Sequence, residues 1–244
     1  NNDSQITRDG GHPLSLNRTS SDGAILNLYK AGDPVGSIST WSSNIAVGRL
    51  NCALLFDDDT NRIKPASVQS NTTRDNVIDL GDPSHRFNDV WIGGGIHLGG
   101  TGSDNKLNDY EKGTYDITIT GATSGSETMR SGYVAQSYVK IGDLVTVTGR
   151  YEVSGGNASG NLQFSLPFAI AGSLDDQSDT AVGSISFFRN ATWFSSTLVQ
   201  AIGYPGTSVM FAAYTTGTAN ESFVTGENCD GGYEGYINFQ YRTA

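Results

Sequence analysis

The sequence has 244 residues, enough for one large domain or two small ones, and it is rich in Gly (31) but poor in Pro (6) and Cys (2). Its formal net charge is −10, from 15 Lys and Arg against 25 Asp and Glu, and no basic run offers a phosphate-binding surface, which excludes a nucleic-acid partner. No apolar run approaches the roughly 20 residues that span a bilayer, and no signal peptide opens the chain. We therefore expect no membrane insertion.

Short runs with a period of two predict strands in residues 1–98, where no helical period is sustained. Leu14 and Leu16 alternate with polar neighbours and predict a hairpin with Ala24–Tyr29 across the Ser-Asp-Gly turn at 21–23. Further short strands are expected at Val35–Ile38, Ile45–Val47 and Leu50–Phe56. Their hydrophobic faces are too thin to form a core within one chain, so we expect an elongated stalk in which several copies share an interior.

A Gly-rich stretch, Gly93–Gly102, marks a boundary, and the pattern changes from Tyr110 onward. Longer runs rich in Val, Ile, Tyr and Phe predict strands at Tyr115–Thr120, Gly132–Ile141, Leu144–Val153, Asn161–Leu166, Val182–Phe188, Ser196–Ile202, Ser208–Tyr214 and Glu234–Tyr241. Antiparallel strands at this spacing are typical of a sandwich or jelly roll. We therefore predict an all-β chain, with an intertwined β-stalk at 1–109 and a jelly-roll-like antiparallel β-sandwich head at 110–244.

Two cysteines leave two alternatives open. A disulfide between Cys52 and Cys229 would join the two halves of the chain. The alternative is two free thiols, with Cys52 a small core residue and Cys229 in a loop. We favour free thiols, because two cysteines do not make a disulfide framework.

Metal and catalytic residues are sparse. His12, His85 and His97 lie far apart, and residues 110–244 contain no histidine, which excludes a Ser-His-Asp or Cys-His arrangement there. His97 could bind a metal on a trimer axis, although a surface position is commoner for a lone strand histidine. The acidic turn Asp57–Asp59 lacks the spacing of a calcium loop and favours a solvated turn. We predict neither a metal nor a cofactor.

The segment 76–100 reads NVIDLGDPSHRFNDVWIGGGIHLGG. A D-L-G turn at 79–81, the run Arg86–Asp89 and the Gly-Gly turns around Ile96–Leu98 together resemble a repeat-like signature of bacteriophage tail fibres. PLSLNRTSSD at 13–22, LNDYEKG at 107–113 and YVKIGDLVTVTG at 138–149 are similar to other fibre elements. The resemblance is close over residues 12–113 and is weaker beyond Gly149. It implies a homotrimer with a narrow β-stalk and a distal globular head that contacts the bacterial surface.

Loop positions predict a ligand-binding surface on the head. If strands alternate up and down from Tyr110, the loops at 121–131, 154–160, 189–194 and 215–233 lie away from the stalk, with Asn157 and Glu227 nearby. Sugars pack their C–H faces on aromatic rings and bond to polar groups, and loops on a rigid scaffold usually carry binding. The candidate ligand-binding residues are Arg189, Asn190, Trp193, Phe194, Phe223 and Tyr233. The alternative for Trp193 and Phe194 is that their rings face the core.

These observations lead us to expect the distal part of a virion's tail fibre, assembled in the host cytoplasm and binding a bacterial surface glycan or outer-membrane receptor without catalysis. The sequence begins at Asn1 rather than Met, so we expect a fragment that joins other tail proteins through a preceding region. A structural spacer or capsid decoration protein without a ligand is the alternative. A surface-glycan hydrolase is less favoured. It needs two carboxylates about 5–10 Å apart, and the long β-helical repeat usual in fibre-borne depolymerases is missing from the sequence.

Overall fold

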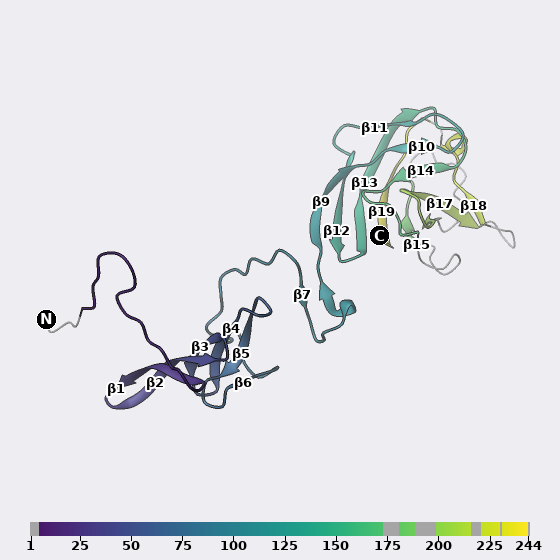
Figure 1. Ribbon diagram of the computed structural model, residues 1–244. Coiled ribbons are helices and arrows are strands. Elements are labelled where there is room, and N and C mark those ends of the chain that lie inside the picture. Colours follow the sequence, from purple (N-terminus) through teal and green to yellow (C-terminus); the bar gives the residue numbers. More distant parts are fainter. Residues whose placement is uncertain (1–4, 173–180, 189–198, 216–220, 230, 244) are drawn as a thin grey trace. The chain divides into compact units, whose positions relative to one another are not determined.

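A computed structural model describes residues 5–172, 181–188, 199–215, 221–229 and 231–243. These residues form antiparallel sheets and two single-turn 3-10 helices, η1 (Ser103–Asn105) and η2 (Gly226–Asn228). The chain divides into two compact units, Asn1–Val90 and Trp91–Ala244 (Figure 1). The all-β prediction is therefore confirmed.

The first unit is a meander in which each strand pairs with the next one. Its strands are β1 (Gly23–Lys30), β2 (Asp33–Trp41), β3 (Asn44–Arg49), β4 (Cys52–Asp57), β5 (Arg62–Ser67) and β6 (Thr72–Thr73). Two-residue turns join β1 to β2 and β3 to β4, and Ala31 and Leu50 adopt the positive φ that such turns require. The hairpin expected between Leu14–Leu16 and Ala24–Tyr29 is wrong, because β1 pairs with β2 instead.

Within residues 5–90 of the first unit, the buried hydrophobic side chains form one small cluster. Its members are Ala46, Ala53, Leu55 and Ala66, with Trp41 and Val68 packed against them. Three of the four buried side chains are single methyl groups, so the cluster removes little apolar area from water. Cys52 was expected in the core but is exposed, because Ala53 and Leu55 are the inward-facing residues of β4. It forms no disulfide with Cys229.

The second unit begins with a two-stranded ladder of β7 (Ile96–His97) and β8 (Lys106–Leu107). Its main sheet contains β9 (Tyr110–Asp116), β10 (Ile119–Gly121), β11 (Glu127–Met129), β12 (Ala135–Ile141), β13 (Leu144–Gly156), β14 (Leu162–Ser165), β15 (Ala181–Ile185), β16 (Val199–Gly203), β17 (Val209–Thr215), β18 (Glu221–Phe223) and β19 (Glu234–Arg242). The strand order is β10-β14-β17-β16-β15-β19-β13-β12-β9, with β11 beside β13 and β18 beside β17. Asp109 belongs to this unit too, since it forms an ion pair with Lys140.

β9 and β10 lie at opposite ends of this strand order, yet they are consecutive in the chain. β9 pairs with β12 and β10 with β14, and only Ile117 and Thr118 separate β9 from β10. The Thr118 backbone N–H donates to the Ser165 hydroxyl over 2.8 Å, and the Ser165 N–H donates to the Thr118 oxygen over 2.9 Å. The expected strand Tyr115–Thr120 is therefore two strands that meet at a bend. The sheet wraps around one core.

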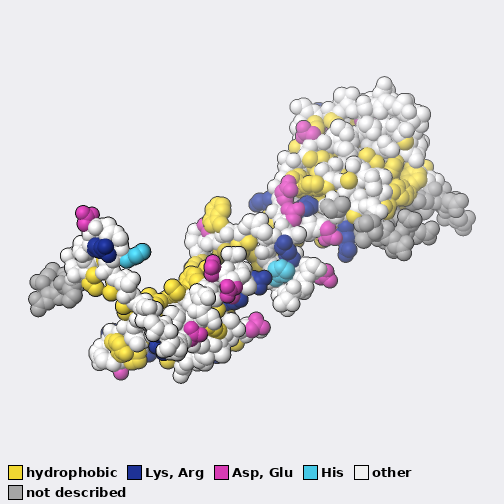
Figure 2. All heavy atoms as spheres, in the orientation of Figure 1, with side chains coloured by type: hydrophobic (Ala, Val, Ile, Leu, Met, Phe, Trp, Pro, Cys, Tyr) yellow, Lys and Arg dark blue, Asp and Glu magenta, His cyan; other side chains and the backbone are white. Residues whose placement is uncertain are grey.

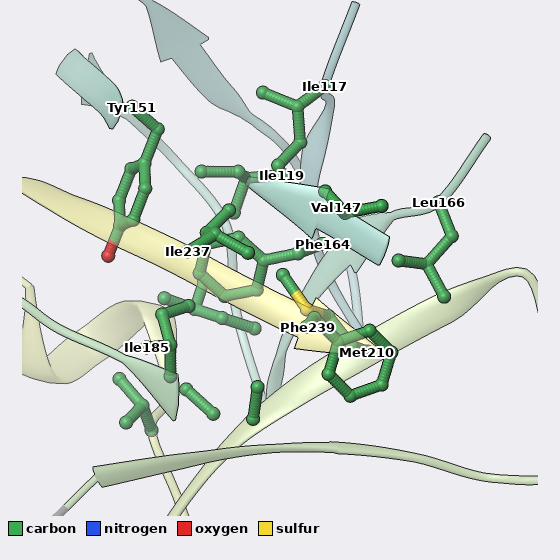
Figure 3. Close-up of a cluster of buried hydrophobic side chains, with 14 of the residues drawn as sticks. Ile117, Ile119, Val147, Tyr151, Phe164, Leu166, Ile185, Met210, Ile237 and Phe239 are labelled. Carbon is green, nitrogen blue, oxygen red and sulfur yellow. The ribbon is translucent and has the colours of Figure 1, made fainter. Parts of the chain in front are cut away.

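That core is large and belongs to one chain. Val147, Phe164, Met210 and Phe239 come from four different strands, and together with Ile117 from the bend they are fully buried and converge (Figure 3). Burying one such side chain contributes about 1.5–3 kcal/mol. The second unit thus has an interior of its own, in contrast to the first.

Candidate functional site

Loops gather at two ends of the second unit. At the end where the chain enters through Tyr110, the Gly142 N–H donates to the Asp109 oxygen over 2.6 Å. At the opposite end, Ser124 and Ser159 form a β-bridge, and the Gly226 N–H donates to the Gly160 oxygen over 3.0 Å. The loops at 121–126, 157–161 and 224–229 therefore meet at one end, as the alternation of strands predicted.

Glu227 joins two of these loops. Its carboxylate accepts the Ser159 hydroxyl over 2.6 Å and the Gly160 N–H over 3.0 Å. The Ser159 hydrogen bond is the main cause that lowers the pKa of Glu227 to about 2, with backbone N–H groups adding to the effect. The carboxylate is thus held ionised, and its contacts are those of a staple between loops.

Two of the six residues expected to bind ligand lie in the described part of the chain. Arg189, Asn190, Trp193 and Phe194 lie outside it. Phe223, on β18, is half-buried, and its ring packs against Phe211 with centroids 5.7 Å apart.

Tyr233 is a core residue, which corrects its expected place at the surface. Its ring is buried and packs against Phe187, with centroids 5.7 Å apart. Burial raises the pKa of its hydroxyl strongly. The loop that carries Tyr233 is at the expected end. However, the Val153 N–H donates to the backbone carbonyl oxygen of Tyr233 over 2.7 Å, and the Tyr233 side chain turns inward.

Alternate residues near the end of three neighbouring segments point away from the core and form one surface. Arg150 pairs with Tyr236 and Glu152 with Glu234 in the register of β13 and β19. Phe188, just beyond β15, forms a β-bridge with Glu234 from the other side. The residues between them in sequence face the core. We refer to Arg150, Phe188, Glu234 and Tyr236 as the outer patch; Glu152 is buried and is not part of it.

Two aromatic rings stand exposed on the outer patch. Phe188 and Tyr236 are 48% and 55% exposed, and their rings meet edge to face with centroids 5.8 Å apart. The sequence showed both residues in strands but gave no sign of their contact. It arises only because β15 pairs with β19, two strands that are distant in the chain. The pair offers an apolar surface that a ligand can cover.

A chain of charges lies beside these rings. Arg150 forms an ion pair with Glu234 and comes within 3.6 Å of Glu152, which also pairs with Arg130. The Arg150 guanidinium lies over the Tyr133 ring, 4.7 Å from its centroid. Glu234 raises the pKa of Arg150 through their hydrogen bond. The guanidinium is thereby held in one place while the Arg150 side chain is still 38% exposed, so it can donate to a ligand.

The first unit exposes a second kind of surface. Along the sheet, Ile45 pairs with Phe56 and Phe56 with Ile63, while Val47 pairs with Leu54. These side chains are 43% to 63% exposed, on the side opposite the small buried cluster. We refer to Ile45, Val47, Leu54, Phe56 and Ile63 as the apolar face. Hydrophobic side chains reach the surface over this unit (Figure 2), and contiguous exposed patches of this kind mark interaction sites.

The described residues contain no group of three or more His, Cys, Asp or Glu side chains placed to hold a metal ion. His97, considered for an axial metal, is exposed on β7. Within the part of the chain that the structure describes, no helix has the length and hydropathy needed to cross a membrane. Comparisons with protein-family models, curated proteins and solved structures found no match.

Proposed function

We propose that this chain is part of a bacteriophage tail fibre and attaches the virion to a bacterial host by binding, without catalysis, a glycan or protein on the cell surface. The observation that carries the proposal is the outer patch, where two exposed rings lie beside a fixed guanidinium. Phe188 and Tyr236 offer faces for the C–H groups of a sugar. Arg150, whose side chain is 38% exposed, offers N–H donors to hydroxyl groups. Aromatic and arginine side chains also dominate the energetics of protein interfaces.

The proposal includes a homotrimer in which the first unit is the stalk. Support comes from the apolar face, which a single copy leaves in water. Three copies that pack these faces together around an axis would bury them. The second unit is then the head, and a sheet wrapped around one core is compatible with a jelly-roll-like sandwich.

Trimerisation also accounts for how a shallow site binds firmly. The outer patch lies on a strand surface, so each copy makes few contacts with its ligand. Three patches on one fibre can engage a bacterial surface together, and such linkage raises avidity by roughly 10²–10⁴ when the geometry permits.

Adsorption to a panel of bacterial strains tests the proposal. The purified chain should bind a subset of strains, and a variant that lacks the second unit should bind none. Binding to no strain and to no glycan on an array would favour the spacer alternative. Shortening of host polysaccharide on incubation would favour the hydrolase.

A further inference from the structure

Near the start of strand β4 lie two arginines that form no ion pair with a carboxylate of the described residues. Arg49 and Arg74 line a cavity of about 650 Å³ beside Cys52. Asp79 lines the same cavity, but no ion pair joins it to either guanidinium among the described residues. The buried Nε atom of Arg74 has no hydrogen-bond partner among them either. This end of the strand therefore presents unsatisfied donors and excess positive charge.

The other end of β4 carries the opposite charge. It runs into the turn after Asp57, whose carboxylate pairs with Lys64. Asp58 and Asp59 follow on the exposed turn, and neither forms an ion pair among the described residues. Arg62, which pairs with Asp57 in the register, is one positive charge against the two carboxylates of Asp58 and Asp59. The turn therefore carries excess negative charge.

Both ends flank the apolar face. The cross-strand pairs of the apolar face lie between two other pairs in the register, Arg49–Cys52 at one end and Asp57–Arg62 at the other. Suppose that three copies turn their apolar faces toward a common axis, with the strands running around it. The start of β4 in one copy then adjoins the end of β4 in the next. A ring joins two different surfaces at every interface, so unlike ends meet at each seam.

We infer that each seam of the trimer is a charged joint, in which Asp58 and Asp59 of one copy enter the cavity lined by Arg49 and Arg74 of the next. The inference rests on the proposed trimer and adds what fixes the register of its copies. The arginine fork matches carboxylate geometry, and a joint of like ends would repel. The apolar face thus drives association while the seam selects the arrangement.

Cross-linking of the full chain tests this joint. Cys52 is exposed beside the arginine cavity, whereas Cys229 is buried, and Asp59→Cys places a third thiol on the acidic turn. Within one chain, the last five residues of β4 and Asp58 separate the thiols at positions 52 and 59 by about 20 Å, beyond the reach of a short bismaleimide. The reagent should therefore join neighbouring copies, and a denaturing gel should show a covalent trimer.

Wild type and Asp33→Cys are the controls. Asp33 begins β2 at the same end of the sheet as Cys52, so its variant should give no covalent trimer. If Asp59→Cys gives covalent dimers only, the copies meet about a two-fold axis and the joint is wrong. If the native mass is that of a trimer and no cross-link forms, the proposed trimer is correct but the proposed charged joint is wrong. A single-copy native mass overturns both.

Discussion

Tyr151 and Tyr233 meet edge to face in the core of the second unit, with ring centroids 6.1 Å apart. The Tyr151 hydroxyl donates to the Ser186 oxygen over 2.8 Å. The buried Tyr233 hydroxyl has no hydrogen-bond partner within the described ranges. Two similar side chains in one cluster therefore differ in how their hydroxyl groups are satisfied, and this difference can be measured.

Removing each hydroxyl should have a different effect on the stability of the second unit. Tyr151→Phe leaves the part-buried Ser186 carbonyl oxygen without its donor and should lower the free energy of unfolding by about 1 kcal/mol. Tyr233→Phe removes a polar atom that is buried without a partner, so it should leave stability unchanged or raise it. Urea unfolding followed by tyrosine fluorescence measures both. An equal loss in the two variants would show that Tyr233 has a partner.

The outer patch should be needed for binding. Tyr236→Ala removes one of the two rings that meet edge to face, and it should reduce adsorption to a susceptible strain by at least about tenfold, the usual effect of losing an aromatic anchor. Tyr236→Phe keeps the ring and should retain most of the binding. Tyr110→Ala is the matched control, since Tyr110 is a similarly exposed strand tyrosine away from the patch. Wild-type adsorption by Tyr236→Ala, with the fold intact, would place the binding site elsewhere.

The apolar face should be needed for assembly. Val47 and Val139 are strand residues of similar exposure, 43% and 38%, but only Val47 lies on that face. Val47→Asn puts an amide where copies are proposed to meet, so it should shift the mass in light scattering toward a single copy. Val139→Asn should leave the mass unchanged. An unaltered mass for both variants would count against this face as the interface.

Acid stability should depend on Glu227. Its pKa falls from 4.5 to about 2 on folding, mainly through the Ser159 hydroxyl. A lowered folded-state pKa contributes stability above pH 4.5, and this contribution is lost as the pH falls toward 2. Glu227→Gln should therefore show a flatter decline of the urea midpoint over this interval than wild type does. Parallel curves for the two proteins would mean that the loop staple is absent in solution.

Alternation along the chain predicted most strands, because inward and outward residues of a strand differ in burial. Leu144–Val153 and Glu234–Tyr241 lie within β13 and β19. The same pattern could not reveal the bend at Ile117 and Thr118, which depends on hydrogen bonds to Ser165 from a distant strand. The strand predicted at Leu14 and Leu16 was wrong, because alternation alone does not show whether a segment has a neighbouring strand to pair with.

In the candidate site, too, local features could be predicted from the sequence and long-range contacts could not. The order of the loops followed from strand parity, which is a local property. Tyr233 was placed at the surface because its loop lies at the right end, but the direction of its side chain depends on packing against Phe187 and Tyr151. Phe188 and Tyr236 were missed because the register between β15 and β19 brings them together.

The mass of the intact chain in solution tests the central claim most directly. The apolar face, left in water by a single copy, leads to the proposed trimer, and the avidity that we propose for the chain depends on that trimer. Sedimentation equilibrium at micromolar concentration should give about three times the chain mass of 25.9 kDa. A monodisperse species of one chain mass, with its β-structure intact, would contradict the account.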